Sequence, residues 1–190
     1  MGNFYTNIVL VGADASAVIK YLADSKRAAY VFEGGRAMTV VYDQICDTQD
    51  VTEIHSLGAD LTKVFDCSAV ACLNHDDDAL FLSAYRGGQL LTEYDSSVGR
   101  HLHPVQLCRA ARVSVLRTPI VFALLVLPNP LYAIFKHMAI ATALRLPKAS
   151  VGSGYEYIDS GEPPTDSSCE PLHVVHTLNP DKPPPRIEPT

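Results

Sequence analysis

Short apolar runs alternate with amphipathic stretches over the first hundred residues of the chain. Residues 4–11 are rich in β-branched and aromatic side chains and end at Gly12, which predicts a strand. Asp14 is then placed to cap a helix that continues to about Arg27. The pattern therefore predicts that the chain opens with a strand and an amphipathic helix.

Two hairpins are predicted in the same part of the chain. The first joins residues 28–32 to residues 37–42, and the second joins residues 80–85 to residues 89–94. Both connections contain a pair of glycines, which readily adopt the positive φ angles of a tight turn. The two pairs of apolar runs therefore indicate antiparallel strand pairs.

A second helix is predicted between these hairpins. Asp50 is placed to cap it, with Glu53 in the position of a capping box. Residues 68–74 form the most continuous apolar run that follows and predict a buried central strand. The apolar positions with helical spacing are Ile54, Leu57, Leu61, Val64 and Phe65.

The chain after residue 95 predicts mainly helices. Residues 105–112 fit a helix, whereas residues 120–127 form a short apolar run that periodicity cannot assign to helix or strand. Pro119 and Pro128 bracket that run, which is too short for a membrane span and is expected in the core. Asn129-Pro130 predicts the start of a last helix, ended by Pro147, with one apolar face formed by Leu131, Ile134, Phe135, Met138, Thr142 and Leu146.

The order β-α-β-β-α-β-β-β predicts an α+β fold over residues 1–158. We expect a single domain with a mostly antiparallel sheet, helices on one face, a ferredoxin-like or split β-α-β plan, and a helical C-terminal third. Residues 159–190 hold eight of the thirteen prolines and more acidic than basic residues, which predicts a flexible acidic tail. Residues 172–176 are its only apolar patch and could dock back on the body.

Composition narrows the function classes. The net charge of −6 argues against nucleic-acid binding, which needs a basic surface. The five cysteines are an odd number without a Cys-x-x-Cys pair, and the first residues lack the pattern of a signal peptide. We therefore expect reduced, buried thiols, a cytoplasmic location and no membrane partner.

Residues 74–78 contain the densest cluster of potential ligands in the chain. Asn74, His75, Asp76, Asp77 and Asp78 directly follow the predicted central strand. Carboxylates and imidazole suit Mg²⁺, Mn²⁺ or Zn²⁺, and His75, Asp76 and Asp78 are the candidate metal ligands. In an extended strand, however, His75 and Asp77 would point to one side and the other three to the opposite side. Asp and Asn also favour turns, so a structural turn is the preferred interpretation.

Other polar segments give weaker signals. Tyr94 and Asp95 at the end of the last predicted strand are a further candidate binding pair, although Asp95 could simply cap the next segment. His101 and His103 could bind a transition metal if a third ligand came from elsewhere. The glycine-rich residues 152–154 lack the context of a phosphate loop and predict a bend that brings nearby tyrosines into packing contact.

Several segments together resemble a group of small, uncharacterised bacterial proteins. They are the strings GNFYTN, VVYD, NHDDD and GSGYEYI, which are spread over most of the predicted domain. The resemblance implies a bacterial protein with one domain, and no activity is known for the group that could be carried over to these residues.

The preferred hypothesis from the sequence is a non-enzymatic cytoplasmic domain that binds another protein, of a regulatory or toxin-neutralising type. Its basis is a small acidic domain without a complete catalytic motif and with a proline-rich tail. The alternative is a metal-dependent hydrolase or metal-binding protein that uses residues 74–78, in which a divalent metal would be the only cofactor. A third possibility is a homo-oligomer that associates through a sheet edge or residues 120–127.

Overall fold

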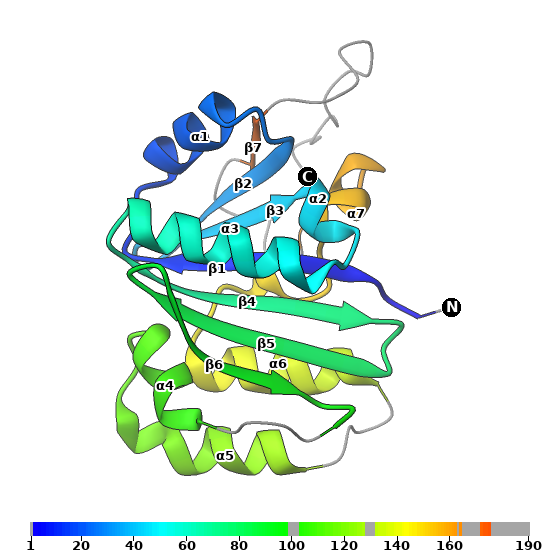
Figure 1. Ribbon diagram of the computed structural model, residues 1–190. Helices are drawn as coiled ribbons and strands as arrows, with labels where there is room; N and C mark the ends of the chain where they lie inside the picture. Colours follow the sequence, from blue (N-terminus) through cyan, green and yellow to red (C-terminus); the bar gives the residue numbers. More distant parts are fainter. Residues whose placement is uncertain (1, 99–102, 128–131, 163, 165–171, 176–190) are drawn as a thin grey trace.

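A seven-stranded sheet forms the centre of the protein (Figure 1). The computed structural model describes residues 2–98, 103–127, 132–162, 164 and 172–175. Every pair of neighbouring strands in the sheet is antiparallel, and the order is β6-β5-β4-β1-β3-β2-β7. The strands are β1 (Tyr5–Val11), β2 (Ala29–Gly34), β3 (Met38–Asp43), β4 (Ser68–His75), β5 (Ala79–Arg86), β6 (Gln89–Asp95) and β7 (Leu172–Val175).

The α+β fold class and the antiparallel sheet are confirmed. Strand β3 lies between β1 and β2, so the β1-α1-β2 unit is split by an inserted antiparallel strand. Both glycine hairpins form as predicted, between β2 and β3 and between β5 and β6. The ferredoxin-like plan as a whole stays a prediction, since β5, β6 and β7 extend the sheet on both sides.

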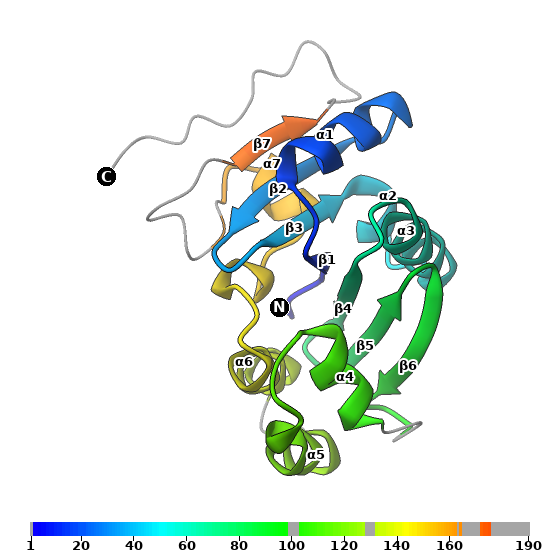
Figure 2. The ribbon, with the colours of Figure 1, turned by 90° about the vertical axis from the view of Figure 1, so that its left-hand side faces the viewer.

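Helices cover both faces of the sheet, whereas the sequence predicted helices on one face. Helices α1 (Ala15–Asp24) and α3 (Val51–Val64) pack on one face, and the short α2 (Gln44–Asp47) lies beside α3 (Figure 2). The opposite face is covered by helices from the C-terminal third. These are α4 (Pro104–Ala110), α5 (Thr118–Val126), α6 (Ala133–Leu144) and α7 (Tyr155–Asp159), with the 3₁₀ turns η1 (Val115–Arg117) and η2 (Lys148–Ser150).

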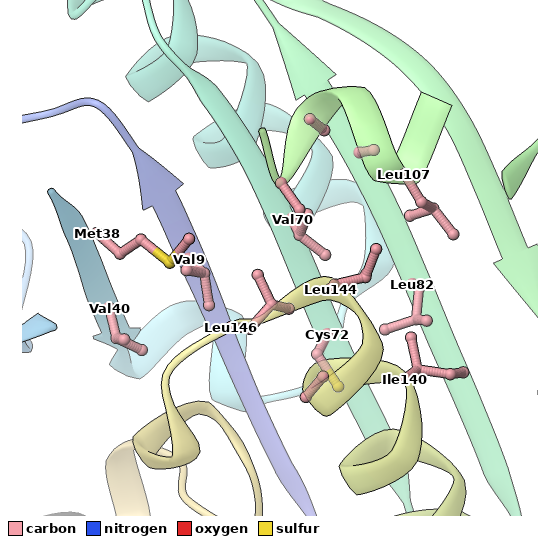
Figure 3. Packing of buried hydrophobic residues seen from close by; sticks show 14 of the residues in the cluster. Val9, Met38, Val40, Val70, Cys72, Leu82, Leu107, Ile140, Leu144 and Leu146 are labelled. Atoms are coloured by element: carbon pink, nitrogen blue, oxygen red, sulfur yellow. The ribbon is translucent and has the colours of Figure 1, made fainter. Parts of the chain in front are cut away.

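The two helical layers are needed because the central strands have apolar side chains on both faces of the sheet. All seven residues of β1 are buried, so its side chains are covered on both faces of the sheet. Ile8 and Leu10 point to the α1/α3 layer, whereas Val9 and Val11 point to the C-terminal layer. In the core between the sheet and the C-terminal layer, strand residues such as Val70 and Leu82 pack against Leu107, Ile140 and Leu144 (Figure 3).

Helix α6 is oriented differently from the sequence prediction. Phe135 and Met138 of the predicted apolar face are about half exposed, and Thr142 of that face is exposed as well. The face that packs on the core is the opposite one. The buried residues of α6 are Ala133, Lys136, His137, Ile140, Ala141, Ala143 and Leu144.

Residues 120–127 form most of helix α5, and the expected burial of this run is wrong for most of its side chains. Only Val121 and Leu125 of α5 are buried, one turn apart on the side that faces α4 and α6. Ile120, Phe122 and Val126 are exposed on the outside of the C-terminal layer. The helix is thus apolar on all sides but covered on one side only.

The predicted tail is described only in part. Leu172–Val175 forms β7 and pairs with β2 at the edge of the sheet, as the docking prediction for the apolar patch anticipated. The rest of residues 165–190 lies outside the described residues, as do Asn129, Pro130, Leu131 and His101. No helix in the described part of the chain is both long and apolar enough to cross a membrane.

Candidate functional site

Residues 76–78 form the tight turn between β4 and β5. The backbone N–H of Asp78 donates to the carbonyl of His75 over 3.0 Å and closes the turn. Asp76 and Asp77 have φ angles of 51° and 58°, in the left-handed region that Asp and Asn tolerate better than most residues. The turn geometry therefore accounts for the run of aspartates.

Asn74 and Asp77 form a buried clamp on the N-terminal segment. The side-chain amide of Asn74 donates to the carbonyl of Asn3 over 2.8 Å and to Asp77 Oδ1 over 3.0 Å. Asp77 Oδ2 accepts from the backbone N–H and the side-chain amide of Asn3, at 3.2 and 2.8 Å. The expectation that the side chains of His75 and Asp77 point to the same side is wrong. Strand β4 ends at His75, so side chains no longer alternate between the two faces of the sheet in the turn that follows, and Asp77 lies beside Asn74.

His75 points away from this clamp. Its ring nitrogen Nδ1 is hydrogen-bonded to Gln49 Oε1, and its ring meets Phe4 edge to face with 5.1 Å between centroids. Gln49 also donates to the carbonyl of Asn74 over 2.9 Å, which ties the end of β4 to the loop before α3. His75 and Asp76 are exposed, as is Asp78. Among the described residues, no group of three or more His, Cys, Asp or Glu side chains is arranged to hold a metal ion.

Tyr94 and Asp95 do not join residues 74–78, because β5 lies between β4 and β6. Asp95 Oδ1 accepts from the backbone N–H and the hydroxyl of Ser97, which makes it a turn residue as the capping alternative proposed. The hydroxyl of the buried Tyr94 donates to the carbonyl of Leu125 over 2.9 Å and accepts from Lys136 Nζ over 2.7 Å. Burial raises the pKa of Tyr94 to about 12. Tyr94 therefore belongs to a buried contact beneath α5.

Lys136 is a buried cation that the sequence analysis did not single out. Besides Tyr94, its ammonium donates to the carbonyls of Leu125 and Leu127 at the C-terminal end of α5. Desolvation lowers the pKa of this lysine. Cations are favourable at this end of a helix because the unpaired carbonyls carry partial negative charge. Lys136 thus holds α5 in place on the C-terminal layer.

A second buried polar cluster joins three residues that are far apart in the sequence. The hydroxyl of Tyr5 and His137 Nδ1 share a hydrogen bond of 2.8 Å, and Cys72 Sγ lies 3.4 Å from the same nitrogen. Burial lowers the pKa of His137 to about 4 and raises the pKa of Cys72 and Tyr5 well above their ordinary values. At neutral pH the thiol therefore stays protonated and the imidazole neutral, which does not favour a nucleophilic cysteine.

The cysteines agree with the sequence prediction where they are described. Cys46, Cys67, Cys72 and Cys108 are free and buried. Burial raises the pKa of Cys67 to about 11 and also raises the pKa of Cys46. Cys169 lies outside the described residues.

Asp47 connects the glycine-rich segment to the sheet. Its carboxylate accepts from the backbone N–H of Thr6 over 2.8 Å and from that of Glu156 over 2.9 Å. Burial raises the pKa of Asp47 to about 6. Tyr155 packs on Tyr30 with 5.1 Å between ring centroids, so the bend at residues 152–154 brings a tyrosine into packing contact as predicted.

The exposed apolar side chains concentrate on the C-terminal layer. Leu116 of η1 is 85% exposed, and Phe122 of α5 is 48% exposed. Both line a shallow groove of about 630 Å³ between α4, η1 and α5. We call this region the α5 surface and define it by Val105, Val115, Leu116, Pro119, Ile120, Phe122, Val126 and Leu127.

Comparison of the chain with protein-family models, with curated proteins and with solved structures finds no match. The resemblance to small bacterial proteins therefore stays a prediction from the sequence.

Proposed function

We propose that the protein is a non-enzymatic cytoplasmic module that binds another protein through the α5 surface. The observation that carries the proposal is the exposure of α5, a helix with an apolar residue at nearly every position and only two buried side chains. A helix that is apolar all round is normally covered on all sides. Contiguous exposed apolar side chains on a folded domain are typical of interaction sites.

The polar residues of the candidate site support a binding role over catalysis. The side-chain amide N–H groups of Asn74 and the carboxylate of Asp77 are hydrogen-bonded to the N-terminal segment and to each other, and Asp76 shapes a turn. The buried thiol and imidazole of the Tyr5 cluster are held in their neutral forms. A regulatory or toxin-neutralising role would use the same kind of surface, because both act by binding a protein.

A comparison of capture experiments tests the proposal. Tagged full-length protein and a Leu116→Ser/Phe122→Ser variant are used to capture partners from lysate of the source cell, and mass spectrometry identifies the captured proteins. We expect a stoichiometric partner with the wild type and its loss with the variant, which should fold normally because both side chains are already exposed.

The control replaces two exposed apolar side chains of the opposite helical layer. Val64 of α3 and Ile45 of α2 are 52% and 43% exposed, so an Ile45→Ser/Val64→Ser variant should retain the partner. Capture that survives in the Leu116→Ser/Phe122→Ser variant but disappears in the control would contradict the proposal.

A further inference from the structure

The charges of the chain are divided sharply between its regions. Residues 96–155 contain seven Lys and Arg residues and no Asp or Glu. Residues 1–95 contain six basic and fourteen acidic residues, and residues 156–190 contain two basic and seven acidic residues. The negative net charge of the whole chain therefore hides a segment of net charge +7, which includes the whole α5 surface.

One of these cations lies directly in the groove of the α5 surface. The exposed Arg109 of α4 lines the groove together with Val105, Val115, Leu116 and Phe122. Arg112 and Arg117 are the next cations along the chain, but the guanidinium of Arg112 lies against Gly12, and Arg117 donates to the carbonyl of Ala143 over 2.9 Å. Arg109 is thus the cation placed to meet a group that enters the groove.

We infer that the α5 surface takes the apolar face of an acidic amphipathic helix of a partner protein. The apolar anchors of that helix would lie on Leu116 and Phe122, and a carboxylate beside them would pair with Arg109. Helix-in-groove recognition uses this combination of apolar anchors and a charged rim. A positive region without acidic residues also attracts an acidic partner and repels a basic one. The inference rests on the proposed function, to which it adds the chemistry of the partner.

Two other occupants fit the charges less well. A symmetric dimer through the α5 surface would bring two copies of Arg109 and two basic layers together. Residues 165–171 contain two acidic residues but no large apolar side chain, and residues 176–190 contain two acidic and two basic residues, so neither part of the chain combines an apolar face with a net negative charge. An acidic amphipathic segment of another protein matches both the apolar lining of the groove and its positive charge.

A designed peptide pair tests the inference with the full-length protein. The probe is a fluorescent peptide of about 18 residues, long enough to form a helix, with leucine at helical spacing and glutamate at most other positions. The matched probe carries lysine in place of every glutamate. Fluorescence anisotropy at low and at physiological ionic strength gives the two dissociation constants. We expect the glutamate peptide to bind at least about tenfold more tightly, with weaker binding at higher salt.

Variants assign the binding to the groove. Arg109→Glu should weaken the affinity for the glutamate peptide about tenfold or more. Lys20→Glu, a charge reversal at an exposed position of α1, should leave that affinity unchanged. The Leu116→Ser/Phe122→Ser variant should bind neither the glutamate peptide nor the captured partner.

The outcomes separate this inference from the proposed function. Equal binding of both peptides, lost in the Leu116→Ser/Phe122→Ser variant, would overturn the acidic-helix inference and leave the docking surface intact. Failure of both peptides to bind would also overturn the inference, whatever the capture experiment shows. Binding to phosphatidylserine vesicles without binding to the glutamate peptide would assign the surface to lipid. Self-association by light scattering that depends on Leu116 and Phe122 would assign it to a second copy and overturn both proposals.

Discussion

Asp77 is the residue of the 74–78 segment on which the structure depends most. It is buried, accepts two hydrogen bonds from Asn3 and one from Asn74, and has a φ angle of 58°. Asp77→Ala removes the acceptor of one buried N–H of the Asn74 amide and of the partly buried N–H groups of Asn3, and alanine also tolerates the left-handed conformation poorly. We expect a loss of about 2–4 kcal/mol in the free energy of unfolding, measured by urea denaturation.

The neighbouring Asp76 provides the control for this prediction. Asp76 is exposed and has a similar φ angle of 51°, and asparagine also tolerates that conformation. Asp76→Asn should therefore change the free energy of unfolding by less than about 0.5 kcal/mol. If Asp76→Asn proved as destabilising as Asp77→Ala, the structural assignment of the clamp would be wrong.

His137 should make the stability of the protein sensitive to acid. Its pKa is about 4 in the fold and near the ordinary 6.5 in the unfolded chain, so the unfolded state binds the proton first as the pH falls. Its stabilising contribution is therefore complete above pH 6.5 and is lost progressively as the pH falls from 6.5 to about 4. The loss should reach the order of 3 kcal/mol at the acid end.

A His137→Asn variant isolates this effect, because asparagine cannot titrate and can still pair with the hydroxyl of Tyr5. Urea denaturation across this pH range should show a steeper loss of stability in the wild type than in the variant. Asp47 titrates with the opposite sign, since its raised pKa favours the fold at low pH, but it is present in both proteins and cancels in the comparison. Parallel pH profiles would refute the assignment to His137.

An ion pair between the partly buried Arg27 and the buried Asp43 connects elements that are separate in the sequence. Asp43 is 1% exposed at the end of β3, where it accepts two hydrogen bonds of 2.7 Å from the guanidinium of Arg27 and one of 3.0 Å from the backbone N–H of Cys46. The ion pair raises the pKa of Arg27 above its ordinary value. The pair thus joins the segment after α1 to β3 and to the start of α2.

Removing one member of this pair should be costly because it strands a buried charge. We expect Arg27→Met to lower the free energy of unfolding by about 3–5 kcal/mol. The double variant Arg27→Met/Asp43→Asn should recover part of that loss, since no buried charge remains. A double-mutant cycle by thermal or urea denaturation checks both values, and a loss below about 1 kcal/mol for Arg27→Met would show that the pair is not important.

Lys136 should control the local stability of α5. Lys136→Met keeps much of the side-chain volume but removes the hydrogen bonds to the carbonyls of Leu125 and Leu127. We expect amide hydrogen exchange in α5 to become about tenfold faster, while exchange in α3 stays unchanged. Equal acceleration in both helices would instead indicate a global loss of stability.

At the scale of elements, the strands were easier to predict than the orientation of the helices. Paired glycines and runs of β-branched residues predicted both hairpins, and both form. In the first hairpin, however, the positive φ angles lie at Arg36 and Ala37 and not at the glycines. Helix α6 has apolar residues around most of its circumference, so its sequence could not show that Phe135 and Met138 face outward. The sequence of α5 does not indicate which of its faces is buried, because apolar residues lie on all sides of the helix.

Residues that are consecutive in the sequence do not form one site in the structure. Asn74, His75, Asp76, Asp77 and Asp78 are consecutive, but the turn separates His75 from the buried pair of Asn74 and Asp77. The partner of that pair, Asn3, lies more than seventy residues away, and Tyr5 and His137 are 132 residues apart, so neither contact has a local signature. The α5 surface did have a sequence signal, the apolar run within a segment without acidic residues.

The whole molecule combines an acidic body with a basic, apolar C-terminal layer. The sheet and the α1/α3 layer carry most of the acidic residues, while the opposite layer holds most of the exposed large apolar side chains of the described chain, with Arg109 among them. Burying only Val121 and Leu125 stabilises α5 on the protein and leaves the rest of its surface available. The molecule is therefore a folded platform on which most of the apolar surface of α5 is exposed, as the proposed binding function requires.

The most direct test is amide hydrogen exchange of the full-length protein alone and in complex with the purified partner from the capture experiment. We expect slower exchange in the complex at η1 and α5, between Val115 and Val126, with little change at the β4–β5 turn. Protection centred on residues 74–78, with none on α5, would contradict the assignment of function to the α5 surface.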